Sequence, residues 1–190
     1  MTKLEIYNIA LAMNGKRTTK DELSASCKPT EVDACDSMYS LAVESVLGEC
    51  DWSYFVHPIR ICMEDDVPYG GWRHGYSIED CDLYRIARVD AGSRPFALLG
   101  GRLYTNEDEP YFWGISMDAF ILETAPKDFC MLVGLYLGYL VSTILSPSDT
   151  AVAQRALQAY SGQLAAARKR ESNNFSLNYL EDGDWSALHS

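Results

Sequence analysis

Histidine and basic residues are scarce in this sequence. It contains 3 histidines, and 16 lysines and arginines against 27 aspartates and glutamates, so its formal net charge is −11. A chain this acidic is a poor general binder of nucleic acids and anionic membranes, because it repels their phosphates. The hydrophobic fraction of 47% is that of an ordinary folded protein and excludes a largely disordered chain. We expect one globular domain, or one domain with an insertion.

The common catalytic and metal-binding motifs are also missing. None of the 6 cysteines forms a C-x-x-C pair, which argues against a zinc ribbon or a thioredoxin-type site. The sequence contains no G-x-S-x-G, no P-loop and no H-E-x-x-H. The N-terminus lacks the layout of a signal peptide, because Glu5 and Asn8 interrupt it. We expect free thiols in a reducing compartment and predict no catalytic residue, no metal and no cofactor.

Helical patterns are present at both ends of the chain. Thr2 and Glu5 form a capping box at the start of a predicted helix over residues 2–13. Apolar residues recur at three- and four-residue steps after Thr30, which predicts a helix over 30–48. Pro126 is suited to the first turn of a helix over 126–145, and the break at 147–149 precedes another over 150–170. Residues 16–29 are polar and are predicted to form a loop.

The middle of the chain has the pattern of short strands. Aromatic and β-branched runs alternate with turn residues from about 51 to 124. Residues 96–105 predict a hairpin that turns at Gly100 and Gly101. The predicted strands occupy residues 54–56, 83–89, 96–99, 102–105, 111–116 and 119–122. The sequence therefore predicts an α+β fold: a four-helix bundle with a small antiparallel β-sheet inserted between its second and third helices.

Residues 129–145 carry no charge, which allows two interpretations. The segment has 17 residues and a small-x-x-x-small pattern at Gly134 and Gly138, both of which occur in membrane spans. It contains Ser142 and Thr143, however, and no basic cluster flanks it. A helix buried among other helices fits better, with the two glycines packed closely against a neighbour and Leu135, Leu137 or Tyr139 facing the interior. A small membrane-associated protein remains an alternative.

Three further groups of residues are candidate sites. The pairs His57 with Cys62 and His74 with Cys81 could be metal-ligand fragments, but their number and spacing favour structural residues at a sheet edge. The carboxylates of 64–66 and 107–109 could be the catalytic groups of a tail-associated hydrolase, which is an alternative function. Adjacent acids in turns are usually solvated, however, which argues against a catalytic pair. The aromatic and glycine-rich segment 69–76 could contact a ligand or partner, or form a mobile turn.

The order of the elements resembles that of a known protein family. The segments that carry the likeness are LEIYNIALAMNGK, GECDWSYF, YSIEDCDLYRIARVD, GGRLYTNEDEPYFWGIS and APKDFCMLVGLYLGYLVSTILSPSDTAVAQRALQAYSGQLAAARKRES. In the last of these, Tyr160, Leu164 and residues 165–167 occupy the places of a tyrosine and an alanine run that lead to basic residues. The set covers most of residues 3–172 and is similar to bacteriophage head-to-tail adaptor, or connector, proteins of the tail tubular protein A type.

The resemblance implies a structural virion protein and no enzyme. Such adaptors form a ring, usually of twelve copies, that joins the portal of the capsid to the downstream tail or nozzle protein. Double-stranded DNA passes through the ring without specific binding, and an acidic surface suits such a channel because it repels phosphates. The resemblance places the protein at the head–tail junction of the virion, and in the host cytoplasm during assembly, with no membrane partner.

The resemblance also divides the chain into an adaptor domain over 1–172 and a docking tail over 173–190. Adaptors of this family bind the portal through their C-terminal part. The tail is predicted to be extended, because its large apolar residues are too irregular for a helix face. The predicted portal-docking residues are Phe175, Leu177, Tyr179, Leu180, Trp185 and Leu188, and a basic rim precedes them at Arg168, Lys169 and Arg170.

Overall fold

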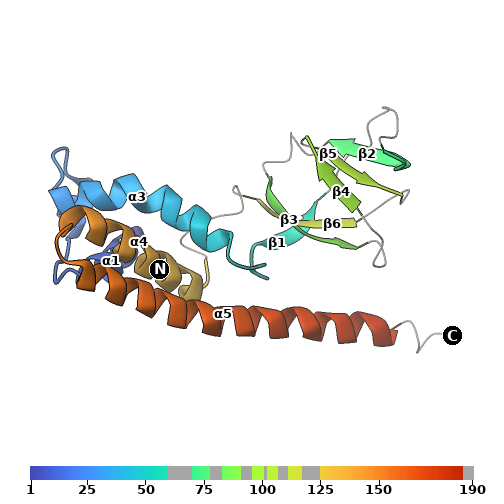
Figure 1. Ribbon diagram of the computed structural model, residues 1–190. Coiled ribbons are helices and arrows are strands. Elements are labelled where there is room, and N and C mark those ends of the chain that lie inside the picture. Colours follow the sequence, from blue (N-terminus) through green and yellow to red (C-terminus); the bar gives the residue numbers. More distant parts are fainter. Residues whose placement is uncertain are drawn as a thin grey trace. The chain divides into compact units, whose positions relative to one another are not determined.

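The protein is a mixed helix and sheet structure, an α+β fold, in two compact units (Figure 1). The computed structural model describes residues 1–59, 70–77, 83–90, 96–100, 102–106, 111–116 and 125–185, with side chains except at 58–59, 83–90, 111–112, 116 and 174–185. Residues Met1–Ser53 and Leu122–Ser190 make up the helical unit, and Tyr54–Ile121 make up the sheet unit.

The helical unit is organised around α4. Its helices are α1 (Lys3–Ala12), α2 (Lys20–Ser24), α3 (Thr30–Leu47), α4 (Lys127–Leu145) and α5 (Thr150–Trp185). Helix α4 packs against α1, α3 and α5, whereas α1 and α3 touch each other only slightly. Apolar residues on several sides of α4 are therefore buried, among them Leu132, Leu137 and Val141. This explains why the segment lacks charge.

Two glycines allow α4 to approach α1 closely. A Cβ atom at Gly134 would lie 2.8 Å from Cγ2 of Ile9, and one at Gly138 would lie 3.1 Å from the carbonyl oxygen of Ala10. Both separations are too short for an ordinary contact, so only glycine fits without a shift of α1. The structure confirms that both glycines contact another helix and that Leu135 and Leu137 are buried.

The N-terminal helices begin where the sequence signals place them, with one exception. The capping box of Thr2 and Glu5 is formed, and Pro29 precedes the first turn of α3. The predicted loop over 16–29 is wrong in part, because α2 occupies five of its residues. A second capping box nucleates α2: Oγ1 of Thr19 accepts from the backbone N–H of Glu22 at 3.3 Å, and the Glu22 carboxylate accepts from that of Thr19 at 2.7 Å.

The prediction of an extended tail from residue 173 is wrong for 173–185, because α5 continues to Trp185. The first half of α5 carries one buried stripe, formed by Val152, Ala156, Tyr160, Leu164 and Ala167. Beyond it the sequence has no helical face, but extending an existing helix avoids the unfavourable nucleation step. In Figure 1, α5 runs antiparallel to α4 and continues well past the first turn of α4. Residues 186–190, including Leu188, lie outside the described residues.

The sheet unit contains two small antiparallel sheets. Strand β6 (Tyr111–Ser116) is central in one sheet, between β1 (Val56–Ile59) and β3 (Leu83–Asp90). Strand β5 (Arg102–Thr105) is central in the other, between β2 (His74–Ser77) and β4 (Phe96–Leu99). The pairing of β3 with β6 is irregular, with register shifts between Leu83 and Arg85 and between Ile86 and Arg88. All strands precede α4 and follow α3 in the chain.

The hairpin of β4 and β5 is confirmed. Phe96 pairs with Thr105 and Leu99 with Arg102, and Gly100 turns the chain with a φ of +57°, a value that favours glycine. Two predictions about other strands are wrong. The strand predicted over 54–56 instead occupies Val56–Ile59 and includes Pro58, and part of the segment 69–76, for which a mobile turn was one interpretation, forms β2. The predicted strand over 119–122 lies outside the described residues.

Candidate partner-binding surface

The three predicted basic residues lie on α5, where it packs against the end of α3 and the start of α4. The Arg168 guanidinium forms an ion pair with the Glu49 carboxylate, and its Nε donates to the Glu49 carbonyl oxygen at 3.2 Å. Arg170 forms an ion pair with Asp128. Lys169 is exposed and has no ion pair with any described residue. The predicted basic rim is therefore largely neutralised within the chain.

Glu49 connects two turns of α5 to the segment that follows α3. Its Oε1 accepts from the Tyr160 hydroxyl at 3.3 Å, while its Oε2 pairs with Arg168. Burial and then the negative charge of Glu49 raise the pKa of Tyr160 above its usual range, so the phenol stays protonated and can donate. Because Arg168 and Arg170 are about half exposed, these ion pairs contribute little to the stability of the fold.

A hollow of about 290 Å³ opens next to these ion pairs. Its floor contains Trp52 and Phe129, whose rings meet edge to face at 5.1 Å and which are 3% and 0% exposed. Its rim contains Arg170, Asp128 and Glu171, and Oε2 of Glu171 accepts from the backbone N–H of Ser53 at 2.8 Å. Pro126, Ala167 and Asn173 complete its lining. An apolar floor within a charged rim suits a protein side chain.

The predicted docking residues follow directly along α5. Phe175, Leu177, Tyr179, Leu180 and Trp185 belong to the helix. The hollow, the ion pairs of α5 and these residues therefore lie along one element. We call this region, from Arg168 to Trp185 with Glu49, Trp52 and Asp128, the α5 junction.

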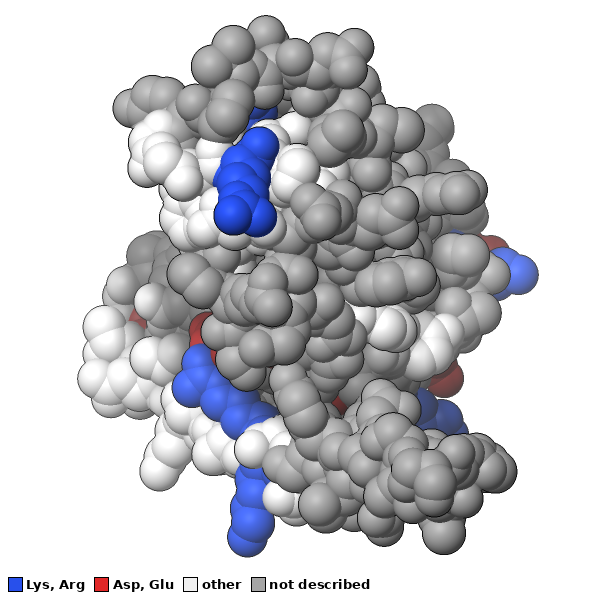
Figure 2. All heavy atoms as spheres, turned by 90° about the vertical axis from the view of Figure 1, so that its right-hand side faces the viewer, with Lys and Arg blue, Asp and Glu red and all other residues white. Residues whose placement is uncertain are grey.

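Figure 2 shows the described charged side chains on one face of the protein. Among the described residues on this face, lysine and arginine side chains are more prominent than aspartate and glutamate. The described side chains include 12 lysines and arginines and 12 aspartates and glutamates, so the net charge of −11 comes from the other residues of the sequence.

The other candidate sites lie mostly outside the described residues. The carboxylates of 64–66 and 107–109 lie outside the described residues, as do Cys62 and Cys81. The described part of the chain holds no group of three potential metal ligands. His57 and His74 lie on β1 and β2, and Nδ1 of His57 is 3.1 Å from the carbonyl oxygen of Phe55.

Helix α4 meets the length and composition of a membrane span. It is the one described helix that does so, and 56% of its most apolar stretch is buried inside the protein. The same properties are found in the core helix of a soluble protein. Helix α4 contacts α1 closely at Gly134 and Gly138, and this packing explains the small-x-x-x-small pattern of the two glycines.

Four of the six cysteines are described, and all four are free thiols. Cys35 and Cys130 are buried, Cys50 is half-buried and Cys27 is exposed. Burial raises the pKa of the Cys35 thiol to about 12, which leaves it protonated and unreactive at neutral pH. These cysteines act as small apolar residues of the core or lie at the surface.

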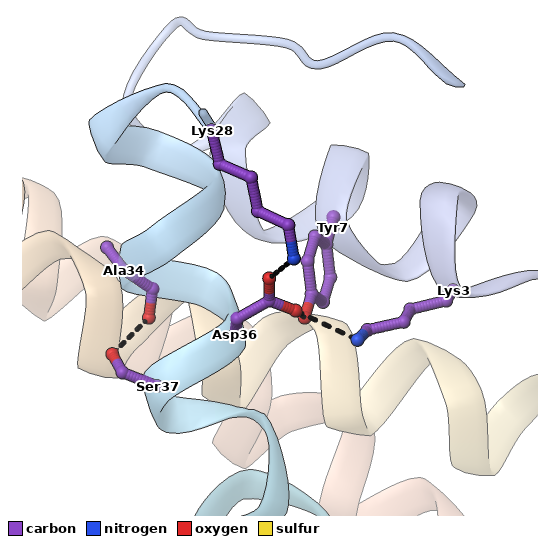
Figure 3. Close-up of polar contacts among 6 residues, drawn as sticks. All are labelled: Lys3, Tyr7, Lys28, Ala34, Asp36 and Ser37. Carbon is purple, nitrogen blue, oxygen red and sulfur yellow. Dashed lines mark hydrogen bonds and ion pairs between the residues drawn. The ribbon is translucent and has the colours of Figure 1, made fainter. Parts of the chain in front are cut away.

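A polar cluster that the sequence did not reveal joins α1, α3 and the segment before α3 (Figure 3). Oδ1 of Asp36 accepts from Nζ of Lys3 at 2.8 Å and from the Tyr7 hydroxyl at 2.5 Å, and its Oδ2 accepts from Nζ of Lys28 at 2.6 Å. Burial alone would raise the pKa of Asp36, but the bonds from Lys28, Lys3 and Tyr7 outweigh it and hold the pKa well below its usual range.

This Asp36 cluster is structural in character. All its donors already bind the one carboxylate, and burial together with Asp36 raises the pKa of Tyr7 above its usual range. Nζ of Lys3 also lies 5.2 Å from the centre of the Tyr7 ring and 5.3 Å from that of Tyr39. Lys3, Lys28 and Asp36 follow no periodic pattern in the sequence, so only the fold brings them together.

The comparisons with known proteins provide no family for the chain. No protein-family model matches the sequence, and no curated protein is significantly similar to it.

Proposed function

We propose that this protein is a head-to-tail adaptor of a bacteriophage virion. In this proposal copies of the chain form a ring, with a dodecamer as the expected form, that binds the capsid portal on one side and a tail or nozzle protein on the other. The ring contributes part of the channel for the genome, and the protein is not an enzyme. It acts at the head–tail junction and is present in the host cytoplasm during assembly.

The observation that carries the proposal is the length of α5. The helix has 36 residues, or about 54 Å at 1.5 Å per residue, against about 28 Å for the 19 residues of α4. Its described buried side chains end at Ala167. The turns that follow carry five of the six predicted docking residues, and we assign them to contacts with a partner.

The order of the elements supports the same proposal. We infer that α1, α3, α4 and α5 act as a four-helix bundle and that the strands form a subdomain inserted between α3 and α4, as in the adaptor family. The order of helices and strands along the chain supports this inference. Portal contacts are assigned to the α5 junction, and the sheet unit is left for other contacts within the assembly.

A truncation tests the docking role. A chain that ends after Ser172 keeps the described buried stripe of α5, the ion pairs of Arg168 and Arg170, and the bond from Ser53 to Glu171. It should melt within a few degrees of the full chain, yet fail to join portal-containing particles in a co-sedimentation assay. A chain that ends after Trp185 is the matched control, because it keeps five of the six docking residues, and it should still join the particles.

Two outcomes would contradict the proposal in different ways. If the chain that ends after Ser172 joins the particles as well as the full chain, the α5 junction does not dock on the portal. If the full chain forms no ring, alone or on added portal, in negative-stain images and light scattering, the adaptor function itself is wrong.

A further inference from the structure

The segment that follows α1 carries the one Asn-Gly pair of the sequence, Asn14 and Gly15. Glycine has no Cβ atom to shield its backbone nitrogen, so this nitrogen can attack the side-chain amide of the preceding asparagine. The attack forms a bond between the Gly15 nitrogen and Cγ of Asn14 and releases ammonia. Water then opens the ring and leaves aspartate or isoaspartate. The conversion consumes one water, releases one ammonia and needs no oxidant or enzyme.

The fold holds both reacting groups in other bonds. Nδ2 of Asn14 donates to Oγ of Ser142 on α4 at 3.1 Å, and the backbone N–H of Gly15 donates to the carbonyl oxygen of Ala12 at 3.0 Å. Gly15 has a φ of +65°, in the left-handed turn that ends α1. The attack requires the Asn14 amide to leave Ser142 and the Gly15 nitrogen to lose the hydrogen that it donates. The conversion therefore needs the end of α1 to come off α4.

The contact on α4 accepts an amide and not a carboxylate. Ser142 is 0% exposed, and its Oγ donates its one hydrogen to the carbonyl oxygen of Gly138 at 2.6 Å, so it can only accept from Asn14. Oδ1 of Asn14 is buried, and no described residue donates to it. A carboxylate at position 14 has no hydrogen for Ser142, which could donate to it only by giving up Gly138. The conversion thus exchanges a hydrogen bond for an unpaired negative charge between α1 and α4.

We propose that Asn14 is a modification site controlled by α4: its amide converts to a carboxylate while the end of α1 is off α4, and the new charge then opposes the return of α1. A seated α1 protects Asn14, because the bond to Ser142 and the bond from Gly15 to Ala12 both have to break first. A chain in which α1 stays undocked is therefore marked permanently and made less stable. This inference does not depend on the adaptor function or on a ring.

Mass spectrometry of the peptide that contains Asn14 measures the rate of conversion in the full chain. The rate should be at least about tenfold lower in buffer than in concentrated urea at the same pH and temperature. Ser142→Ala removes the acceptor of the Asn14 amide and should raise the rate in buffer about two- to tenfold. Thr143→Ala is the matched control, because this exposed residue donates to the carbonyl oxygen of Leu140, and it should convert like the wild type. Circular dichroism of each variant checks that it is folded.

Two substitutions of Asn14 test the effect of the product. Asn14→Asp introduces the carboxylate, whereas Asn14→Ala, the matched control, loses the hydrogen bond without adding a charge. The melting temperature of Asn14→Asp should lie at least about 3 °C below that of Asn14→Ala. If Ser142→Ala does not fold, the comparison of buffer with urea and the two Asn14 variants still decide. Equal conversion rates in buffer and urea, a rate unchanged in folded Ser142→Ala, or equal melting temperatures of the two Asn14 variants would overturn the inference and leave the adaptor proposal untouched.

Discussion

Single residues in the helical unit decide how closely its helices approach. Gly138 and Gly162 are both helical glycines, but a Cβ at Gly138 meets the backbone of Ala10, whereas one at Gly162 meets nothing within 4 Å. A side chain at the first position requires the backbone of α1 to move by a few tenths of an ångström, whereas one at the second position meets open space.

We predict opposite effects of alanine at these two positions. Gly138→Ala should lower the free energy of unfolding by roughly 1–3 kcal/mol, because the backbone of α1 has to move away. Gly162→Ala should raise it by roughly 0.5–1 kcal/mol, because alanine is the better helix former. Urea unfolding followed by circular dichroism measures both. Equal effects of the two substitutions would show that Gly138 is not in close contact with α1.

The Asp36 cluster predicts a dependence of stability on pH. Asp36→Asn keeps an acceptor for Tyr7 but loses the charge that binds Lys3 and Lys28, which should cost about 1–2 kcal/mol at pH 7. The pKa of Asp36 is lower in the folded state than in the unfolded state. Its contribution is therefore fully present above the unfolded pKa of about 4 and is lost as the pH falls below that value.

The difference between wild type and Asp36→Asn should accordingly shrink as the pH is lowered below about 4. Chemical denaturation at a series of pH values from 7 to the acid range measures it. Asp33→Asn is the control on the same helix, because Asp33 is exposed, and it should change stability by only a few tenths of a kcal/mol. A difference that stays constant as the pH falls would exclude a charged, bonded Asp36.

At the scale of elements, the sequence predicted those structures whose signals are local. The starts of α1 and α3, the extent of α4 and the hairpin of β4 and β5 follow from capping residues, apolar periodicity and glycine turns. The sequence failed where the signal was weak or came from elsewhere. Helix α2 has a capping box like that of α1 but no apolar face behind it, and strand β2 is defined by its pairing with β5 rather than by its own residues, HGYS.

The residues of the candidate site show the same difference between local sequence signals and contacts that only the fold creates. Arg168 and Arg170 were expected at the end of a helix, but their ion pairs with Glu49 and Asp128 join residues that are 119 and 42 positions apart. No local pattern encodes such pairs. The helical continuation of α5 past Ser172 was not predicted, because the large apolar residues there are spaced irregularly and show no helical period.

A matched pair of proline substitutions tests the two halves of α5. Ser161→Pro lies within the packed half and should cost roughly 3 kcal/mol or more, because proline breaks the helix there. Ser176→Pro should reduce the ellipticity at 222 nm while the melting temperature stays close to that of the wild type. If Ser176→Pro leaves the ellipticity unchanged, the last turns of α5 are not helical in solution. If it lowers the melting temperature as much as Ser161→Pro, they belong to the core.

At the scale of the whole molecule, two properties govern its interactions: a division into a helical and a sheet unit, and a large excess of negative charge. The division places the α5 junction, to which we assign the portal contacts, within the helical unit. The charge limits what can approach the protein, because polyanions are repelled over a distance of about 8–10 Å at moderate salt.

The charge predicts weak binding of duplex DNA. Arg168 and Arg170 are paired with carboxylates, so Lys169 is the only one of the three predicted basic rim residues without an ion pair to a described residue. The free protein should not bind DNA measurably at about 0.15 M salt in a fluorescence anisotropy assay. As a control, Glu49→Gln and Asp128→Asn together release both arginines and should strengthen any binding seen at low salt. Tight, salt-sensitive binding by the wild type would contradict a channel that repels DNA.

The central position of α4 also has a consequence for synthesis on the ribosome. Helix α1 depends on α4 for its contacts, and the side chains of Asn14 and Ser142, which are hydrogen-bonded at 3.1 Å, are 128 residues apart. The ribosome adds about 5–20 residues per second, so the apolar residues of α1 emerge several seconds before their partner exists. The intervening strands can pair during that interval. Ile6 and Leu11 must therefore remain exposed, or be held by a chaperone, until the chain is nearly complete.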